Sequence, residues 1–80
     1  MLYTVYAIKS IQRNYIYVGM TSNLLERLHR HNSGYERTTK PYAPYILLYE
    51  EKCADRLIAR HREKYLKSGV GKEFLRSLER

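Results

Sequence analysis

The chain has few of the residues that would tie it to secretion, to a membrane or to a structural metal site. It has 80 residues, with one cysteine, no tryptophan, two prolines and four glycines. Cys53 cannot form an internal disulfide, and small secreted domains usually depend on several, so a reducing cytoplasm is favoured. No stretch approaches the roughly 18 apolar residues of a membrane span, and no charged segment followed by an apolar run opens the chain. We expect a cytoplasmic protein with no membrane partner.

Acidic residues are scarce beside basic ones. The chain has eight Asp and Glu against fifteen Lys and Arg, which gives a formal net charge of +7. Because so much positive charge on a small surface attracts polyanions, nucleic acid is the expected partner. Hydrophobic residues make up 44% and charged residues 29%, as in folded rather than disordered chains. This length supports one modest core, so we expect a single domain over residues 1–80.

The first part of the chain predicts a β-hairpin. Residues 2–8 and 15–20 are rich in aromatic and β-branched types, which favour strands. The polar segment 9–14 between them is too short for a crossover helix, so the two strands should be antiparallel. With an even number of residues in the loop, Tyr6 and Tyr17 point to the same face of the sheet.

A short helix is predicted after the hairpin. Asn23 can cap it, and Glu26 has the spacing of a capping box, so the helix should run over residues 24–32. Arg27 and His31 are four residues apart and therefore share one shoulder of this helix. The apolar arc beside them consists of Leu24, Leu25 and Leu28.

The second half of the chain, after a helix-terminating Gly34, predicts one strand and two helices. The apolar run at residues 45–49 suits a central, buried strand. Asp55 can cap a helix over residues 56–68, and a last helix follows over residues 72–78. The faces expected to be buried are Leu57, Ile58, His61 and Tyr65 on the first of these helices and Phe74, Leu75 and Leu78 on the second. The predicted fold is an α/β (α+β) domain, a small, mainly antiparallel three-stranded sheet flanked by helices in the order β-β-α-β-α-α.

Four segments together resemble a known family. Thr4-Val5-Tyr6 and, about ten residues later, Tyr17-Val18-Gly19 resemble the paired signatures of the GIY-YIG nucleases. Residues 24–32 resemble the helix that follows these signatures, and residues 62–69 are similar to the family's later glutamate segment. The resemblance covers residues 3 to about 75. Known members include homing endonucleases, some restriction enzymes and the incision subunit of bacterial nucleotide-excision DNA repair.

The resemblance implies a metal-dependent endonuclease that hydrolyses phosphodiester bonds in DNA. It places the general base on Tyr6, the contact with the scissile phosphate on Arg27, and the ligand of Mg²⁺ or Mn²⁺ on Glu63. Tyr17 and His31 would complete the catalytic set, and Tyr17 stays open as an alternative base. One carboxylate can serve for Mg²⁺, because this ion keeps several waters and takes substrate phosphate as a further ligand. A tyrosine is a base only where nearby cations favour its phenolate.

A second group of residues is predicted to hold the nucleic acid. These residues are Arg30, Arg37, Lys40, Lys67 and Lys72. The basic loop at residues 35–43, with Tyr35 and Tyr42, can grip the backbone or stack on unpaired bases, which gives little base readout. We therefore expect structure-selective or weakly sequence-specific cutting of DNA, with RNA as a possible substrate, by a protein that can act as a monomer.

Simpler interpretations stand beside these. Tyr6 and Tyr17 can be ordinary strand aromatics, and Arg27 an ordinary solvated arginine. Glu63 can simply pair with Lys67, four residues onward. We interpret His29, His61 and Cys53 as structural. A nucleic-acid-binding module that has lost turnover is the main alternative function, and an RNA-binding accessory protein is a third. The first signature has Thr4-Val5 where Gly-Ile is usual, and the family's asparagine is absent from residues 75–78.

Overall fold

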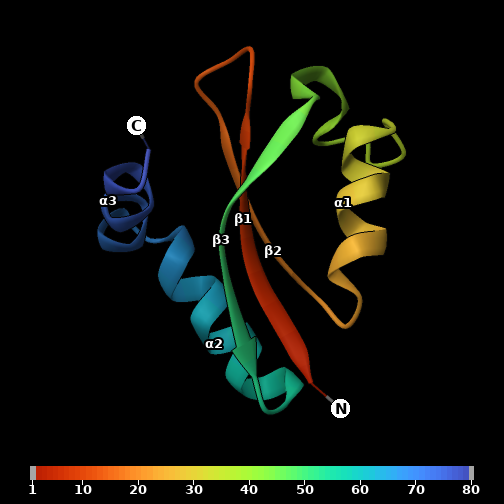
Figure 1. The fold of residues 1–80 in the computed structure, drawn as a ribbon. Helices are drawn as coiled ribbons and strands as arrows, with labels where there is room; N and C mark the ends of the chain where they lie inside the picture. The colour runs from red at the N-terminus through yellow and green to blue at the C-terminus, as the bar shows by residue number, and fades with distance from the viewer. Residues whose placement is uncertain (1, 80) are drawn as a thin grey trace.

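The computed structural model describes residues 2–79 and places one antiparallel sheet between helices (Figure 1). The strands are β1 (Tyr3–Ser10), β2 (Ile16–Thr21) and β3 (Tyr45–Cys53), and the helices are α1 (Leu24–Asn32), α2 (Arg56–Lys67) and α3 (Gly69–Ser77), with a short 3-10 helix at Lys40–Tyr42. Helix α1 covers one face of the sheet, and α2 and α3 cover the other. The predicted fold class and element order are confirmed. Within the described range no helix has the length and apolar composition to span a bilayer.

Strands β1 and β2 form the predicted antiparallel hairpin. Tyr6 lies opposite Gly19, and Ile8 lies opposite Tyr17. Since alternate residues of a strand point to the same face, Tyr6 and Tyr17 share one face of the sheet. Their rings are tilted against each other, with centroids 6.3 Å apart.

Alternation along β1 gives the molecule two cores, one on each face of the sheet. On one face Val5 and Ala7 pack against side chains of α2 and α3. On the other face Tyr6 and Ile8 pack against Leu24 and Leu28 of α1. They also pack against Tyr45, which is 5% exposed. Cys53 lies in the first core and is 4% exposed, which agrees with its predicted packing role.

Helix α1 begins and ends where its caps predict. The Asn23 side chain accepts a hydrogen bond from the Glu26 backbone N–H at 3.2 Å. The Asn23 backbone N–H donates to the Thr21 hydroxyl at 3.0 Å, so that hydroxyl fills the place expected for the Glu26 carboxylate. Gly34 follows the helix with a φ of 78°, a conformation that favours glycine. Leu25 is 80% exposed, so the apolar face is narrower than predicted.

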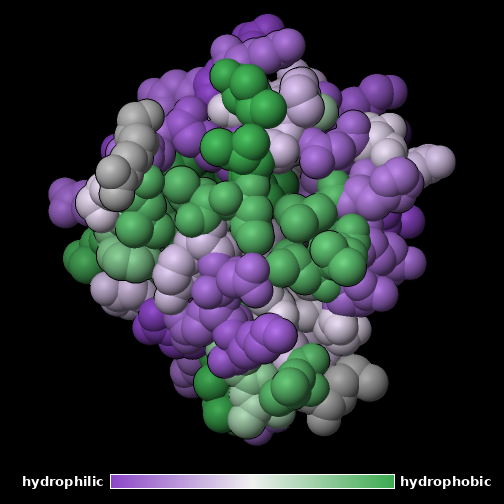
Figure 2. Space-filling view, viewed as in Figure 1, coloured by the Kyte–Doolittle hydropathy of each residue, from purple (hydrophilic) through white to green (hydrophobic). Residues whose placement is uncertain are grey.

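Strand β3 differs from the prediction of a central strand. The strand order is β2-β1-β3, so β1 is central and β3 is an edge. Ile46 is 52% exposed and Leu47 is 39% exposed. Figure 2, viewed as in Figure 1, shows apolar side chains gathered across the middle of the molecular surface. A short apolar run carries no periodicity that separates a central strand from an edge strand, which explains the error.

Helix α2 buries a different face from the predicted one. Its buried residues are Ala59, Glu63 and Leu66. The predicted face of Leu57, Ile58, His61 and Tyr65 is exposed, so His61 is not a core residue, and His29 on α1 is exposed as well. The small Ala59 side chain lets the helix lie close to the sheet. Hydrophobicity alone could not select this face, because three of the four large apolar side chains of the helix lie outside and only Leu66 is buried.

The junction between α2 and α3 lies one turn earlier than predicted. Ser68, expected inside the first helix, caps the end of α2 and the start of α3, and its side chain accepts from the Gly71 N–H. Helix α3 therefore begins at Gly69 rather than Lys72. A Cβ at Gly71 would overlap the Tyr65 carbonyl oxygen and the Leu66 Cα, so only glycine permits this fold-back. On α3 Leu75 is fully buried, whereas the other two predicted core residues, Phe74 and Leu78, are 40% and 36% exposed.

Candidate active site

Four of the five predicted catalytic residues meet on the face of the sheet that α1 covers. Tyr6 comes from β1 and Tyr17 from β2, while Arg27 and His31 project from neighbouring turns of α1. The His31 ring centroid lies 4.9 Å from that of Tyr17 and 5.8 Å from that of Tyr6. The hairpin register and the position of α1 across it bring these four side chains together.

A buried chain of hydrogen bonds runs from Tyr6 through His31 to Thr39. The Tyr6 Oη and His31 Nε2 are 2.8 Å apart, and His31 Nδ1 and Thr39 Oγ1 are also 2.8 Å apart. The Thr39 hydroxyl donates to the Glu36 carbonyl at 3.4 Å, so it accepts from a proton on Nδ1. His31 Nε2 is then an acceptor, and the Tyr6 hydroxyl donates to it.

Thr39 is a site residue that the sequence analysis missed. It is fully buried, and its carbonyl accepts a hydrogen bond from the Tyr45 hydroxyl at 2.8 Å, which holds the loop after α1 against β3. A threonine within a polar, basic loop carries no sequence pattern that distinguishes it from its exposed neighbour Thr38. Only the folded loop places its hydroxyl against His31.

Burial keeps both partners of the central hydrogen bond neutral near pH 7. Desolvation raises the pKa of Tyr6 to about 12, although the neighbouring Arg27 guanidinium opposes this rise. Burial, and secondarily the charge of Arg27, lower the pKa of His31 from its ordinary value. Tyr6 is therefore a phenol and His31 a neutral imidazole, so His31 can accept the proton that Tyr6 would release.

Arg27 carries a buried hydrogen-bond donor without an acceptor. Its Nε is buried and has no hydrogen-bond partner among the residues described, although the side chain as a whole is half-buried. An unpaired buried donor is costly in free energy, and a charged donor more so. An oxyanion in this place would satisfy it.

Glycine in the second signature makes room for the two tyrosines. A Cβ at Gly19 would lie 2.7 Å from the Tyr6 hydroxyl oxygen and 3.0 Å from Cε2 of Tyr17. Both phenol rings thus lie directly over the backbone of β2 at this point. Any larger residue would push Tyr6 away from His31.

Glu63, the fifth predicted residue, lies on α2, which covers the opposite face of the sheet from Tyr6. Its side chain is nearly buried, and its carboxylate forms ion pairs with Lys67 at 3.3 Å and Arg60 at 3.7 Å. Lys67 in turn lines a hollow at the edge of β2 together with Tyr17. Glu63 therefore lies on the opposite face of the sheet from the other four residues.

The carboxylate of Glu63 is the acidic ligand that the predicted catalytic set offers to a divalent cation. Within residues 2–79 there is no group of three His, Cys, Asp or Glu side chains able to hold a metal ion. Glu63 can supply one oxygen ligand after releasing Lys67 or Arg60. That donor set fits a weakly held Mg²⁺ or Mn²⁺ that takes its other ligands from water and substrate phosphate.

The five basic residues predicted to hold nucleic acid separate into two groups. Arg30, Arg37 and Lys40 lie at the end of α1 and in the following loop, whereas Lys67 and Lys72 lie on α2 and α3. Arg30 is paired with Glu36 at 2.8 Å and also lies over the ring of Tyr35. The structure thus leaves two distinct basic surfaces as candidates for the nucleic acid.

The two tyrosines of the loop after α1 differ in what they can offer a nucleic acid. Tyr42 stacks on Tyr15, with ring centroids 4.1 Å apart. One face of the Tyr42 ring is therefore already covered. Tyr35 is 67% exposed. Of this pair, Tyr35 is the ring that a base could reach more freely.

Comparison with known proteins gives a consistent result. A family model described as the GIY-YIG catalytic domain matches residues 2–75. A UPF0213 protein of Desulfotalea psychrophila is 39% identical over 54 residues, which are 65% of this chain and 49% of that protein. The match thus spans about half the length of that relative. The solution NMR structure of a UPF0213 protein from Bacillus halodurans superimposes with a TM-score of 0.58 at 27% identity, over 99% of this chain and 86% of the other.

Proposed function

The chain belongs to the GIY-YIG catalytic domain family, and from this premise we propose that it is an endonuclease that hydrolyses DNA phosphodiester bonds with the help of a divalent cation. The observation that carries the proposal is the buried chain of hydrogen bonds from Tyr6 to Thr39 beside the unpaired Nε of Arg27. A proton acceptor and a phosphate ligand are the two groups that this reaction needs from side chains.

Tyr6 and His31 act together as the base. A phenol with a pKa of about 12 is a poor base by itself. As the attacking water forms its bond to phosphorus, it gives a proton to Tyr6 Oη, and the phenol proton passes along the existing hydrogen bond to His31 Nε2. His31 then becomes an imidazolium whose Nδ1–H is held by Thr39. The relay avoids a free phenolate in a buried position.

Arg27 binds the scissile phosphate. Its unpaired Nε and its charge stabilise the negative charge that grows on the nonbridging oxygens as the water attacks. When bound at Glu63, a divalent cation supplies further charge stabilisation at the phosphate and at the leaving oxygen. Tyr17 lies against both His31 and Tyr6 and holds their rings in place.

The substrate is DNA that the protein recognises mainly through its backbone. Lys and Arg contacts to phosphate position a nucleic acid but carry no direct sequence information. A net charge of +7 therefore supports structure-selective or weakly sequence-specific cutting. The ion pairs of Glu63 with Lys67 and Arg60 favour one alternative, a nucleic-acid-binding module on the same fold without turnover.

Nicking of supercoiled plasmid and of branched DNA by the purified protein tests the proposal. We expect cutting with Mg²⁺ or Mn²⁺ that is abolished by EDTA and reduced at least about 100-fold in Arg27→Ala and Glu63→Gln, because each removes charge stabilisation of the transition state. His29→Ala, an exposed change on the same helix, should cut normally. Salt-sensitive DNA binding without cutting on any substrate would instead support the binding module.

A further inference from the structure

A groove runs along the free edge of β2, between this strand and helices α2 and α3. Among residues 2–79 strand β2 pairs with β1 alone, so its outer edge carries backbone groups without a strand partner there. Two adjoining hollows share Tyr15, Ile16 and Lys72 and together form this β2-edge groove. Its strand wall consists of Tyr15, Ile16 and Tyr17, and its helix wall of Lys67, Lys72 and Arg76.

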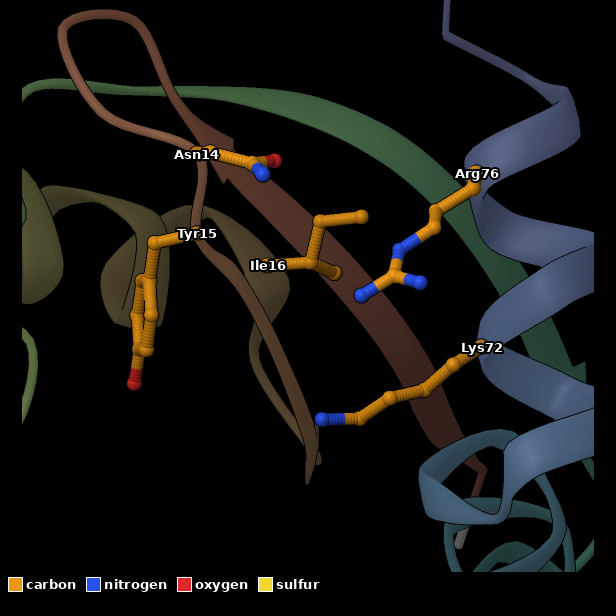
Figure 3. A pocket seen from close by; sticks show the side chains of 5 residues that line it. All are labelled: Asn14, Tyr15, Ile16, Lys72 and Arg76. Atoms are coloured by element: carbon orange, nitrogen blue, oxygen red, sulfur yellow. The ribbon is translucent and has the colours of Figure 1, made fainter.

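The helix wall of the β2-edge groove is basic. Lys72 and Arg76 are four residues apart on α3, and Figure 3 shows both side chains extending from that helix towards β2. Neither forms an ion pair with a carboxylate within residues 2–79. Lys67 pairs with Glu63, and none of the residues that line the groove is acidic. This wall attracts a polyanion.

The strand beside the groove connects it to the candidate active site. The Tyr15 and Tyr17 side chains belong to the core on the α1 face, and Figure 3 shows the Tyr15 ring turned away from Lys72 and Arg76. Tyr17 lines the groove and also lies against Tyr6 and His31. Tyr15 is half-buried, and one face of its ring is stacked on Tyr42. From Tyr17 back to Asn14 the strand spans roughly 10 Å.

We propose that the β2-edge groove binds a single-stranded segment of the nucleic acid next to the phosphate held by Arg27. The direction of the bound nucleic-acid strand rests on the proposed function: it enters the groove at Tyr17, next to the active site, and leaves past Arg76. Cations on the helix wall follow the phosphates, and the rings of Tyr15 and Tyr17, on the α1 side of β2, offer surface to unpaired bases that turn around the edge of the strand. Bases in a duplex are stacked on each other and cannot use the tyrosines. Arg76 thereby becomes a nucleic-acid-binding residue that the sequence analysis did not identify.

Binding measured in EDTA tests the groove without depending on turnover. Fluorescent single-stranded DNA and a duplex of the same sequence are titrated with the wild type, with Lys72→Ala/Arg76→Ala and with Arg56→Ala/Lys64→Ala. The last pair removes the same charge from exposed positions of α2 outside the groove. We expect the groove variant to bind single strands at least about tenfold more weakly, with a salt slope reduced by about 1.4, and the control variant to change affinity less than threefold.

Three outcomes would overturn the proposal that the β2-edge groove binds a single strand. The first is an equal loss in both double variants, which indicates general attraction by net charge. The second is an equal loss for duplex and single strand. The third is a larger loss in Arg37→Ala/Lys40→Ala, which assigns the strand to the loop after α1. Thermal melting confirms that each variant is folded. Groove binding without cutting in the plasmid assay would refute the proposed function alone, whereas cutting with intact single-strand affinity in the groove variant would refute the groove alone.

Discussion

The Tyr6 hydroxyl oxygen lies so close to Gly19 that a Cβ on the glycine would approach it to 2.7 Å. Tyr6 is fully buried and bonded to His31, so its ring has no free space into which it could retreat. The second signature of the family is thus coupled to the first through space, across one pair of strands. The glycine determines where the phenol stands, and the phenol determines where its proton can go.

We expect Gly19→Ala to displace the Tyr6 hydroxyl and break its hydrogen bond to His31. The overpacking should lower the free energy of unfolding by about 1–3 kcal/mol. Loss of the proton relay should lower the cleavage rate about 100-fold. Urea unfolding and plasmid nicking measure the two effects. Wild-type cutting by this variant would show that the close approach of Tyr6 to β2 has no catalytic role.

Thr39→Val should impair the site while keeping the shape of the side chain. It removes the acceptor of the His31 Nδ1 proton and leaves that buried N–H unpaired, at a cost of about 1–3 kcal/mol in stability. His31 would also lose its orientation, so kcat should fall with little change in KM. Thr39→Ser should restore both the stability and kcat. Thr38→Val, at the exposed neighbour, should resemble the wild type. Equal kinetics for Thr38→Val and Thr39→Val would contradict the positioning role.

The stability of the fold should decrease below about pH 6.5 because of His31. Burial and Arg27 lower the pKa of this histidine in the folded state, so its neutral form is favoured there. A group with a lowered folded pKa stabilises the fold above its unfolded pKa, and this contribution is lost as the pH falls through the folded pKa. Protonation of Nε2 also removes the acceptor for Tyr6. Unfolding free energies between pH 8 and pH 4 should show this loss in the wild type and in His29→Gln, but not in His31→Gln.

Two glycines of α3 should respond oppositely to alanine. At Gly71 a Cβ would overlap backbone atoms of α2, so Gly71→Ala should lower the free energy of unfolding by at least about 2 kcal/mol. At Gly69 no atom lies within 4 Å of such a Cβ. Gly69→Ala should leave the stability unchanged or raise it by up to about 1 kcal/mol. Similar melting temperatures for the two variants would show that the helices do not pack as closely as the structure indicates.

Much of the local structure and part of the site followed from the amino-acid sequence. The hairpin register placed Tyr6 and Tyr17 on one face, and helical spacing placed Arg27 and His31 on one shoulder of α1. These inferences succeeded because alternation, caps and helical turns act between residues at most four positions apart, and because a short loop leaves adjacent strands few ways to pair. The edge position of β3 and the buried face of α2 were not predictable in this way, since each depends on which segment packs against which.

Sequence by itself determined the family, the order of the elements and the pairing of the two signatures, because each is encoded in short, contiguous patterns. Tertiary structure alone decided that His31 meets Thr39, that Glu63 stands on the helix that covers the opposite face of the sheet from Tyr6, and that Arg76 shares a groove with Tyr17. The physical reason is the same in each case. Contacts between distant segments are set by how helices and strands close over a common core, and no local pattern records which side chains that closure brings together.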